Sequence, residues 1–410
     1  PHQYEPNPSI GPGGSPSVDS AHFRVYTSDT TTASTTLKML EAAHTCFVET
    51  LGWRTPGLSY KSDTGTYYKM NVYPAKESDM PGAAAQTWTD NNRGFAYLKV
   101  VTKYLANPSI VVHEFGHAMT YSEKNWIDQT RTGAWWETIA NFIADTYIAT
   151  PVCTSAKQSA GVSTALGDSL IELKKVIGDS YQVIVDGSSG TGNYYQAWPF
   201  LVYITNNPDA YPGLGKEVLQ NMIRKYSLNS NETPLHSLAR LLGNTSGGGG
   251  VTVQQVVARY WARMAYVDIG HAKARTLFEA QRKSLNYANV DAGGGGKWMV
   301  KSARAPRYMG ASIVPLKASG GNVSVEVTAA SGGGSTGLRT TLAVRGADGS
   351  GRYVDAVGGK ASVVLGSGEE VSLVVVNAPA ALVQYDAFSL SAEVNRGVGW
   401  SVQISGAQPS

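Results

Sequence analysis

The pentapeptide HEFGH at positions 113–117 constrains this chain more than any other feature. Two histidines four residues apart lie on one face of a helix, about one turn or ~6 Å apart along its axis. Both imidazoles can therefore reach one zinc ion at roughly 2.0–2.1 Å. The glutamate after the first histidine then lies beside the open position of that ion, where it can accept a proton from water. The pattern predicts His113 and His117 as metal ligands and Glu114 as general base.

The residues around the pentapeptide favour a helix over 108–121. Asn107 is a good capping residue, and Pro108 suits the first helical position, where its missing N–H costs nothing. The apolar residues of this segment recur at helical spacing, and the segment 95–101 just upstream is typical of a strand. An ordinary amphipathic helix with two core histidines would leave Glu114 unexplained.

A catalytic zinc site has three protein ligands, so a third one is needed. We predict Glu137, because it is a carboxylate within the apolar helical segment 134–149 and would be costly to bury without a metal or a partner. Asn141, one turn further on, could bind the second ring nitrogen of a ligating histidine. The metzincin pattern is absent, since position 123 is Glu instead of the third histidine. The alternative for Glu137 is a solvated acid on a helix face.

These residues resemble the gluzincin metallopeptidases, of which thermolysin is the best-known member. The likeness is carried by the pentapeptide and by Glu137 with Asn141, at the position where that family has Glu-x-x-x-Asp. The amide in place of aspartate bears on how firmly a histidine is oriented, not on the ligand set. More closely, WETIAN at 136–141 and YYQAWPF at 194–200 resemble a family of secreted fungal and bacterial HExxH proteins of poorly defined activity.

The three predicted ligands imply one Zn²⁺ per chain, and the resemblance implies a tyrosine or histidine that stabilises the oxyanion. Tyr194 or Tyr195 is the candidate for that task, with His236 and His271 as alternatives. Because the chain has 22 tyrosines, a packing role is the competing reading for both tyrosines.

Composition is consistent with a secreted hydrolase. The 34 basic and 31 acidic residues nearly balance, which argues against a nucleic-acid or membrane partner, and no apolar run reaches the ~18 residues of a membrane span. Cys46 and Cys153 are the only cysteines, and we predict one disulfide between them rather than two buried thiols. A start at Pro1 instead of Met fits the same expectation of a processed chain. Asn231, Asn244 and Asn322 begin N-glycosylation motifs.

The sequence divides into three predicted parts. Residues 1–20 are rich in Pro, Gly and Ser and are expected to form an extended arm. Residues 21–304 are expected to form an α+β zinc-peptidase catalytic domain, with a twisted-sheet lobe followed by a helical lobe. Residues 305–410 contain short Val-rich runs separated by Gly and Ser turns, which predicts an all-β antiparallel sandwich.

Element positions follow from the same patterns. Strands are expected at 23–27, 67–73 and 95–101, and a helix near 37–51. Helices are predicted at 108–121, 134–149, 163–177, 194–206, 214–226, 234–242, 252–264 and 271–285. Seven sandwich strands are predicted between 312 and 404.

The function predicted from the sequence is a secreted, extracellular zinc metallopeptidase that hydrolyses peptide bonds. We expect a protein or peptide substrate, with or without glycans, and a monomer. Two alternatives stay open: a zinc hydrolase that acts on glycan or cell-wall bonds, and a glycan- or surface-binding protein with a vestigial zinc site. The intact Glu114 argues against the last, because a degenerate site would be free to lose its base. Candidate sugar-docking aromatics in the sandwich are Tyr353, Tyr385 and Trp400.

Overall fold

The computed structural model describes residues 1–123, 125, 132–243, 250–330 and 337–410. Two compact units divide the chain: the first contains Pro1–Leu170 and Lys216–Ser230, and the second contains Ile171–Gly215 and Asn231–Ser410. The mixed helix-and-strand composition and the antiparallel sheets near the C-terminus agree with the predicted α+β part followed by a β-sandwich, and the zinc-peptidase fold stays a prediction. These units are not divided at residues 20 and 304, where the sequence analysis places its domain boundaries. The three predicted domains therefore stay a prediction.

The first unit contains a five-stranded sheet of order β2-β3-β5-β7-β6. Its central strands β3, β5 and β7 run parallel, and the edge strands β2 and β6 pair antiparallel to their neighbours. The strands are β2 (Val18–Asp19), β3 (Phe23–Val25), β5 (Met70–Ala75), β7 (Phe95–Val101) and β6 (Ala85–Asp90). β1 (Tyr4–Glu5) pairs with β4 (Tyr67–Tyr68), so the predicted N-terminal arm contributes two short strands, β1 and β2.

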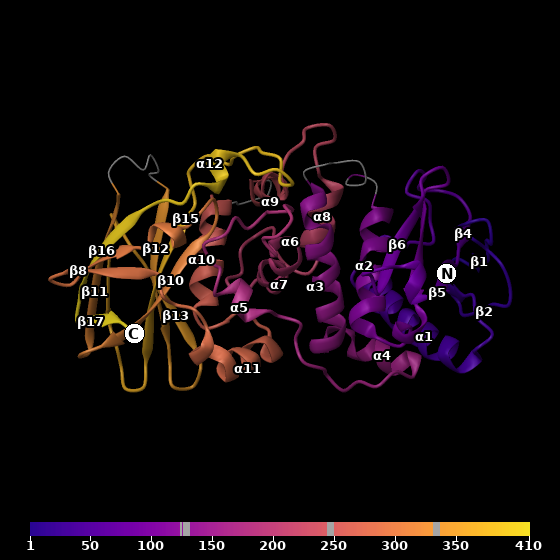
Figure 1. Cartoon of the computed structure of the whole chain (residues 1–410), viewed down its shortest axis with the longest axis horizontal. Coiled ribbons are helices and arrows are strands. Elements are labelled where there is room, and N and C mark those ends of the chain that lie inside the picture. Colours follow the sequence, from indigo (N-terminus) through magenta and orange to yellow (C-terminus); the bar gives the residue numbers. More distant parts are fainter. Residues whose placement is uncertain (124, 126–131, 244–249, 331–336) are drawn as a thin grey trace. The chain divides into compact units, whose positions relative to one another are not determined.

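Two helices pack on this sheet and on each other: α1 lies against β2 and β3, and α2 lies against β6 and β7. α3 packs beside α2, as Figure 1 also shows. The helices of the unit are α1 (Thr30–Ala43), its continuation as a π-helix η1 (His44–Thr50), α2 (Pro108–Ser122), α3 (Trp136–Ala149), α4 (Thr154–Ala160) and α8 (Val218–Arg224). Short 3₁₀ turns are η2 (Glu77–Asp79), η3 (Thr102–Tyr104), η4 (Thr132–Trp135) and η5 (Pro151–Cys153).

The predicted disulfide is confirmed. Cys46 and Cys153 are bonded at an S–S distance of 2.04 Å across 107 residues of sequence. The bond joins the π-helix η1 to η5, just beyond the end of α3. In a chain-entropy account, closing so long a loop removes many conformations from the unfolded state.

The predicted helix at 163–177 is wrong over most of its length, since only α5 (Leu173–Val176) is helical. The preceding residues pair with α3 instead of with each other. Asp145 Oδ1 accepts hydrogen bonds from the Ser169 hydroxyl at 2.8 Å and from the Leu170 amide at 2.7 Å. The Gly167 amide donates to the carbonyl of Ile148. These tertiary bonds satisfy the backbone in an irregular conformation, so helical propensity does not decide the segment.

The second unit joins short helices to a β-sandwich. Its other helices are α6 (Asn193–Gln196), α7 (Pro199–Asn206), α9 (Pro234–Gly243), α10 (Val253–Met264), α11 (Ala272–Gln281), α12 (Ala392–Asn395) and the 3₁₀ turns η6 (Arg282–Ser284) and η7 (Ser302–Arg304). α10 packs on strands β10, β12 and β15. Trp261 on α10 donates its ring N–H to the carbonyl of Met309 at 2.9 Å.

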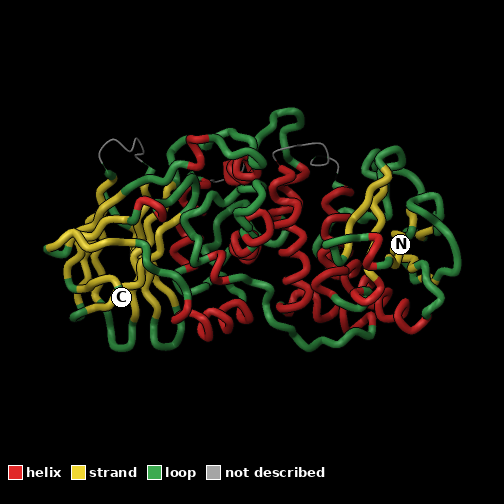
Figure 2. The backbone as a smooth tube through the Cα atoms, viewed as in Figure 1, coloured by secondary structure: helices red, strands yellow, loops and turns green. Residues whose placement is uncertain are grey.

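Two antiparallel five-stranded sheets form the sandwich, of order β13-β12-β15-β10-β17 and β14-β11-β16-β9-β8 (Figure 2). Alternate residues from both sheets meet in one apolar core around Val325, Leu373 and Trp400. The strands are β8 (Val290–Gly294), β9 (Lys297–Val300), β10 (Ala311–Ala318), β11 (Asn322–Ala329), β12 (Leu338–Arg345), β13 (Gly351–Asp355), β14 (Lys360–Val364), β15 (Glu370–Asn377), β16 (Trp400–Ser405) and β17 (Ala407–Pro409). β8 and β9 precede residue 305, so the sandwich begins before the predicted boundary.

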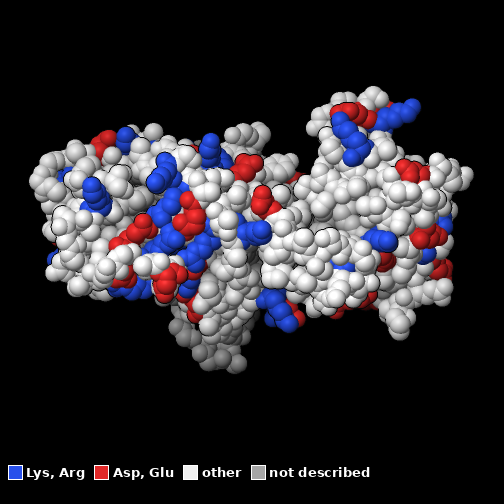
Figure 3. All heavy atoms as spheres, turned by 90° about the horizontal axis from the view of Figure 1, so that it is seen from below, with Lys and Arg blue, Asp and Glu red and all other residues white. Residues whose placement is uncertain are grey.

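Charged side chains of both signs are interspersed on the face drawn in Figure 3. No helix in the described part of the chain combines the length and the apolar character needed to cross a bilayer.

Candidate metal centre

Helix α2 presents the two motif histidines on one face. Its first turn has the predicted cap, in which the Asn107 side chain accepts a hydrogen bond from the Ser109 amide at 3.0 Å and Pro108 follows the cap. The rings of His113 and His117 lie 4.8 Å apart, centre to centre. This is the separation expected for residues four apart on a helix, so both Nε2 atoms can serve one site.

Gly116 explains how α3 comes close enough to supply a third donor. A Cβ atom at this position would lie 3.1 Å from the Cα of Ala140 and 3.3 Å from the Cβ of Ile143, both on α3. The glycine therefore removes the side chain that would hold the two helices apart. Glu137 lies in the first turn of α3. There the helix dipole favours a negative charge.

The three side chains converge. Glu137 Oε1 lies 2.7 Å from His117 Nε2, and Glu137 Oε2 lies 3.1 Å from His113 Nε2. The donor atoms of all three lie within 4.8 Å of one another. Ligands about 2.1 Å from a tetrahedral ion stand about 3.4 Å apart, so small movements would admit an ion here. Two imidazoles and a carboxylate are a donor set that catalytic zinc uses, and the residues therefore fit the metal that the sequence implies.

Asn141 lies where its predicted role requires. Its Oδ1 is 2.8 Å from His113 Nδ1. With an amide oxygen as partner, Nδ1 donates its proton to Asn141, so Nε2, the nitrogen next to Glu137, is the one that can bind a metal once its own proton is lost.

The carboxylate of Glu114 is held by Thr87, a residue that the sequence did not single out. The glutamate is buried, and its Oε2 accepts a hydrogen bond from the Thr87 hydroxyl at 2.6 Å. Thr87 lies on the edge strand β6, and its hydroxyl is also 2.9 Å from the Glu114 carbonyl. No spacing rule connects positions 87 and 114, so only the pairing of β6 with β7 beside α2 brings them together.

Hydrogen bonds and charge within this cluster shift the pKa values of Glu137 and His113. Burial raises the pKa of Glu137, but hydrogen bonds from His113 and His117 outweigh it and the pKa falls to about 2. Burial lowers the pKa of His113, but the hydrogen bond and charge of Glu137, with the charge of Glu114, raise it above its usual 6.5. The carboxylate is therefore ionised across the physiological range and ready to bind a cation.

The remaining predicted residues lie in the second unit. Tyr194 and Tyr195 are on α6, where Tyr194 has edge contacts with the rings of Tyr195 and Phe388. His271 caps α11 by accepting a hydrogen bond from the Ala274 amide. His236 Nδ1 lies 2.8 Å from the Thr233 hydroxyl. The assignment of an oxyanion-stabilising role to any of these four residues stays a prediction.

Two of the three predicted sugar-docking aromatics are buried, and the third, Tyr353, is partly buried. Trp400 and Tyr385 are 2% and 4% exposed, and Tyr353 donates a hydrogen bond to Asp268 Oδ2 at 2.6 Å. The buried rings of Trp400 and Tyr385 serve packing.

Of the predicted glycosylation motifs, Asn231 and Asn322 are exposed. Asn244 lies outside the described residues.

No curated protein matches this chain. A family model, by contrast, matches nearly its whole length, residues 20–410. By that match, the chain belongs to DUF6055, a family of unknown function.

Proposed function

We propose that this protein is a zinc-dependent metallopeptidase of the gluzincin type. His113, His117 and Glu137 are the zinc ligands, Glu114 is the general base, and Asn141 orients His113. The observation that carries the proposal is the Glu137 carboxylate, which spans both motif histidines at 2.7 and 3.1 Å. A surface acid would not adopt this position, and a purely structural ion pair would not need Glu114 beside it.

Bound by His113, His117 and Glu137, a zinc ion would supply a Lewis acid for the scissile carbonyl and would lower the pKa of a water molecule towards about 7. The role of Glu114 would be that of general base, which takes a proton from the attacking water and gives one to the leaving amine. Thr87 holds the carboxylate of Glu114 through Oε2, which leaves Oε1 for the proton. Burial of Glu114 strengthens its interactions, because the surrounding protein has a lower dielectric constant than water.

Secretion is part of the proposal. The Cys46–Cys153 disulfide is typical of proteins that fold in an oxidising compartment. The substrate we propose is a protein or peptide outside the cell, because the donor set and the base are those of peptide hydrolysis.

The test is mass-spectrometric profiling of products after incubation of zinc-loaded protein with peptide and glycoprotein mixtures. We expect new peptide termini from the wild type and few or none from Glu114→Gln, which keeps all three ligands. As a matched control, Glu77→Gln changes an exposed glutamate of the same unit and should cleave like the wild type. Equal cleavage by Glu114→Gln would show that another group is the base. Release of glycans without new peptide termini would favour the glycan-hydrolase alternative.

A further inference from the structure

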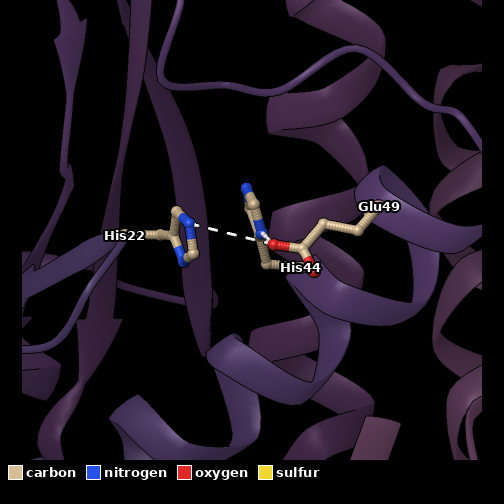
Figure 4. Close-up of side chains that lie close together, drawn as sticks. All are labelled: His22, His44 and Glu49. Carbon is tan, nitrogen blue, oxygen red and sulfur yellow. Dashed lines mark ion pairs between the residues drawn. The ribbon is translucent and has the colours of Figure 1, made fainter. Parts of the chain in front are cut away.

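A second group of two histidines and one glutamate lies in the first unit, and none of its members is on α2, the motif helix that carries His113 and His117. His22 precedes β3, and His44 and Glu49 lie on the π-helix η1. Their donor atoms lie within 4.8 Å of one another. Figure 4 shows an oxygen of the Glu49 carboxylate facing both imidazole rings.

The π-helix brings His44 and Glu49 together. Residues five apart on an α-helix point about 140° away from each other. A π-helix repeats its hydrogen bonds from i to i+5, so residues 44 and 49 return to one side. Glu49 Oε1 accordingly lies 3.6 Å from His44 Nδ1 and 4.0 Å from His22 Nε2. Such distortions of an α-helix are rare and occur often at functional sites.

His44 has an unsatisfied nitrogen inside this group. The residue is 3% exposed, and its Nδ1 has no hydrogen-bond partner among the described residues. The 3.6 Å to Glu49 is too long for a hydrogen bond. Leaving a buried polar atom unsatisfied costs about 1–3 kcal/mol, so such an atom calls for a ligand.

Glu41 fixes the orientation of His22. Its carboxylate lies 2.8 Å from His22 Nδ1 and also accepts a hydrogen bond from the His22 amide at 2.8 Å. Nδ1 therefore carries the ring proton, and Nε2 is left to face Glu49. A carboxylate on the second nitrogen is the usual support of a metal-ligating histidine.

We propose that His22 Nε2, His44 Nδ1 and Glu49 Oε1 form a second divalent-metal site, which takes an ion that prefers imidazole, such as zinc. The separations of 3.6 and 4.0 Å are slightly wider than the ~3.4 Å between ligands of a tetrahedral ion, so binding draws the three side chains inward. The rings of His22 and His44 are stacked 3.9 Å apart, and they must tilt so that both nitrogens point at the ion. The Glu49 side chain is half exposed, which leaves an entry path and a position for water.

The site has a structural role, because it ties β3 to the end of α1. Phe23, next to His22, packs edge-on against both His44 and Phe115 of the motif helix, at ring distances of 6.1 and 5.7 Å. A metal at this point would therefore hold the packing that supports α2. Neither Glu41 nor Glu49 directly follows a ligand on the same helix, as Glu114 follows His113, so the site has no equivalent of the proposed base.

The test is zinc stoichiometry of the full chain after chelation and reloading, measured by elemental analysis and titration. The wild type is compared with His113→Ala/His117→Ala, which removes two ligands of the motif centre. We expect two equivalents in the wild type and one in the double variant. One equivalent in each would overturn the motif centre and leave the second site standing. One in the wild type and none in the folded double variant would overturn the second site.

Variants of the second site then identify its ligands within the double-variant background. Glu49→Gln changes a half-exposed residue and should fold, and we expect it to weaken zinc binding at least tenfold. Glu41→Gln should weaken binding 10- to 100-fold, as removal of a histidine's carboxylate support does elsewhere. Glu77→Gln should leave binding unchanged. Equal zinc affinity in Glu49→Gln and in its parent would overturn the assignment, whatever the behaviour of a His44 variant. X-ray absorption at the zinc edge should show two imidazole ligands.

Discussion

The two histidine–glutamate clusters of the first unit have the same three donors but differ in their spacing. In the motif cluster the glutamate lies 2.7 and 3.1 Å from the histidine nitrogens, so hydrogen bonds join the groups before any metal binds. In the second cluster the corresponding distances are 3.6 and 4.0 Å, and a buried nitrogen is left without a partner. Only the motif cluster has a further glutamate, Glu114, directly after a ligand. The difference separates the cluster that we propose for proton transfer from the one that we propose to hold an ion.

The largest effect should follow from the base that only the motif cluster has. Glu114→Gln should lower kcat for peptide hydrolysis by about 10²–10⁴ while zinc content stays at the wild-type value, because the amide cannot accept the proton. Steady-state kinetics with elemental analysis of the same samples measures both. Wild-type kcat in this variant would remove the distinction between the two clusters.

Loss of the disulfide should affect the second cluster more than the first. Cys46 lies on the π-helix between His44 and Glu49. Cys46→Ser/Cys153→Ser should lower the free energy of unfolding by about 2–4 kcal/mol, because the unfolded chain regains the freedom of a long loop. Denaturant unfolding, followed by zinc titration of the folded variant, tests this. An unchanged unfolding midpoint would mean that the bond contributes nothing to stability.

Asn141 supports only the motif cluster. Asn141→Ala should weaken zinc binding there 10- to 100-fold and leave the second equivalent unaffected, since His113 loses the acceptor that fixes its ring. Asn141→Asp is the matched control, because it keeps an acceptor oxygen. Competition titration against a zinc chelator resolves the two affinities. Loss of affinity in the aspartate variant equal to that in the alanine variant would exclude an orienting role.

Zinc binding at the motif cluster should weaken as the pH falls. Burial lowers the pKa of His113, but Glu137 outweighs it, so the metal-free ring holds its proton above pH 6.5. Zinc displaces that proton, and affinity should fall about tenfold per pH unit below this pKa.

In the metal-free protein, the ion pair between His113 and Glu137 contributes to stability with the opposite pH dependence. Its contribution from His113 is full below about pH 6.5 and is lost as pH rises through the raised pKa. The contribution from Glu137, whose pKa falls to about 2, is full above about pH 4.5 and is lost towards pH 2. The gain in Tm on adding zinc should therefore be larger at pH 8 than at pH 6, by calorimetry. A gain that is larger at pH 6 would contradict the ligand assignment.

The smallest effect should come from Thr87, which touches the base but no ligand. Thr87→Val removes the hydroxyl 2.6 Å from Glu114 and keeps the branched shape that suits an edge strand. We expect kcat to fall about tenfold, the value of one hydrogen bond to a charged group, with zinc content unchanged. Thr87→Ser, which restores a hydroxyl, should recover most of the rate. A serine variant as slow as valine would point to packing instead.

The motif cluster of His113, His117 and Glu137 was predictable because it depends on residues close together in the sequence. A spacing of four residues on one helix, a cap before it and a carboxylate in an apolar helix are all visible in the sequence, and the structure brings the same three donors together. The sandwich strands were predictable for a similar reason, since alternating valines and glycine turns record a buried face. Cys46 and Cys153 were paired by counting alone.

The second cluster was not predictable, because it depends on features without a sequence rule. His44 and Glu49, five residues apart, would lie on different faces of an α-helix. No sequence pattern at those positions predicts a π-helix. His22 joins them only through the pairing of β3 in the sheet. Thr87 is tied to Glu114 in the same non-local way. The helix expected at 163–177 failed for the related reason that Asp145 on α3 binds that segment.

Anomalous diffraction at the zinc edge, from crystals of zinc-loaded protein, tests the motif centre most directly. We predict a peak at about 2.0–2.2 Å from the Nε2 atoms of His113 and His117 and from a carboxylate oxygen of Glu137. A zinc-loaded crystal with no peak among these three side chains would contradict the assignment of this cluster as the metal centre.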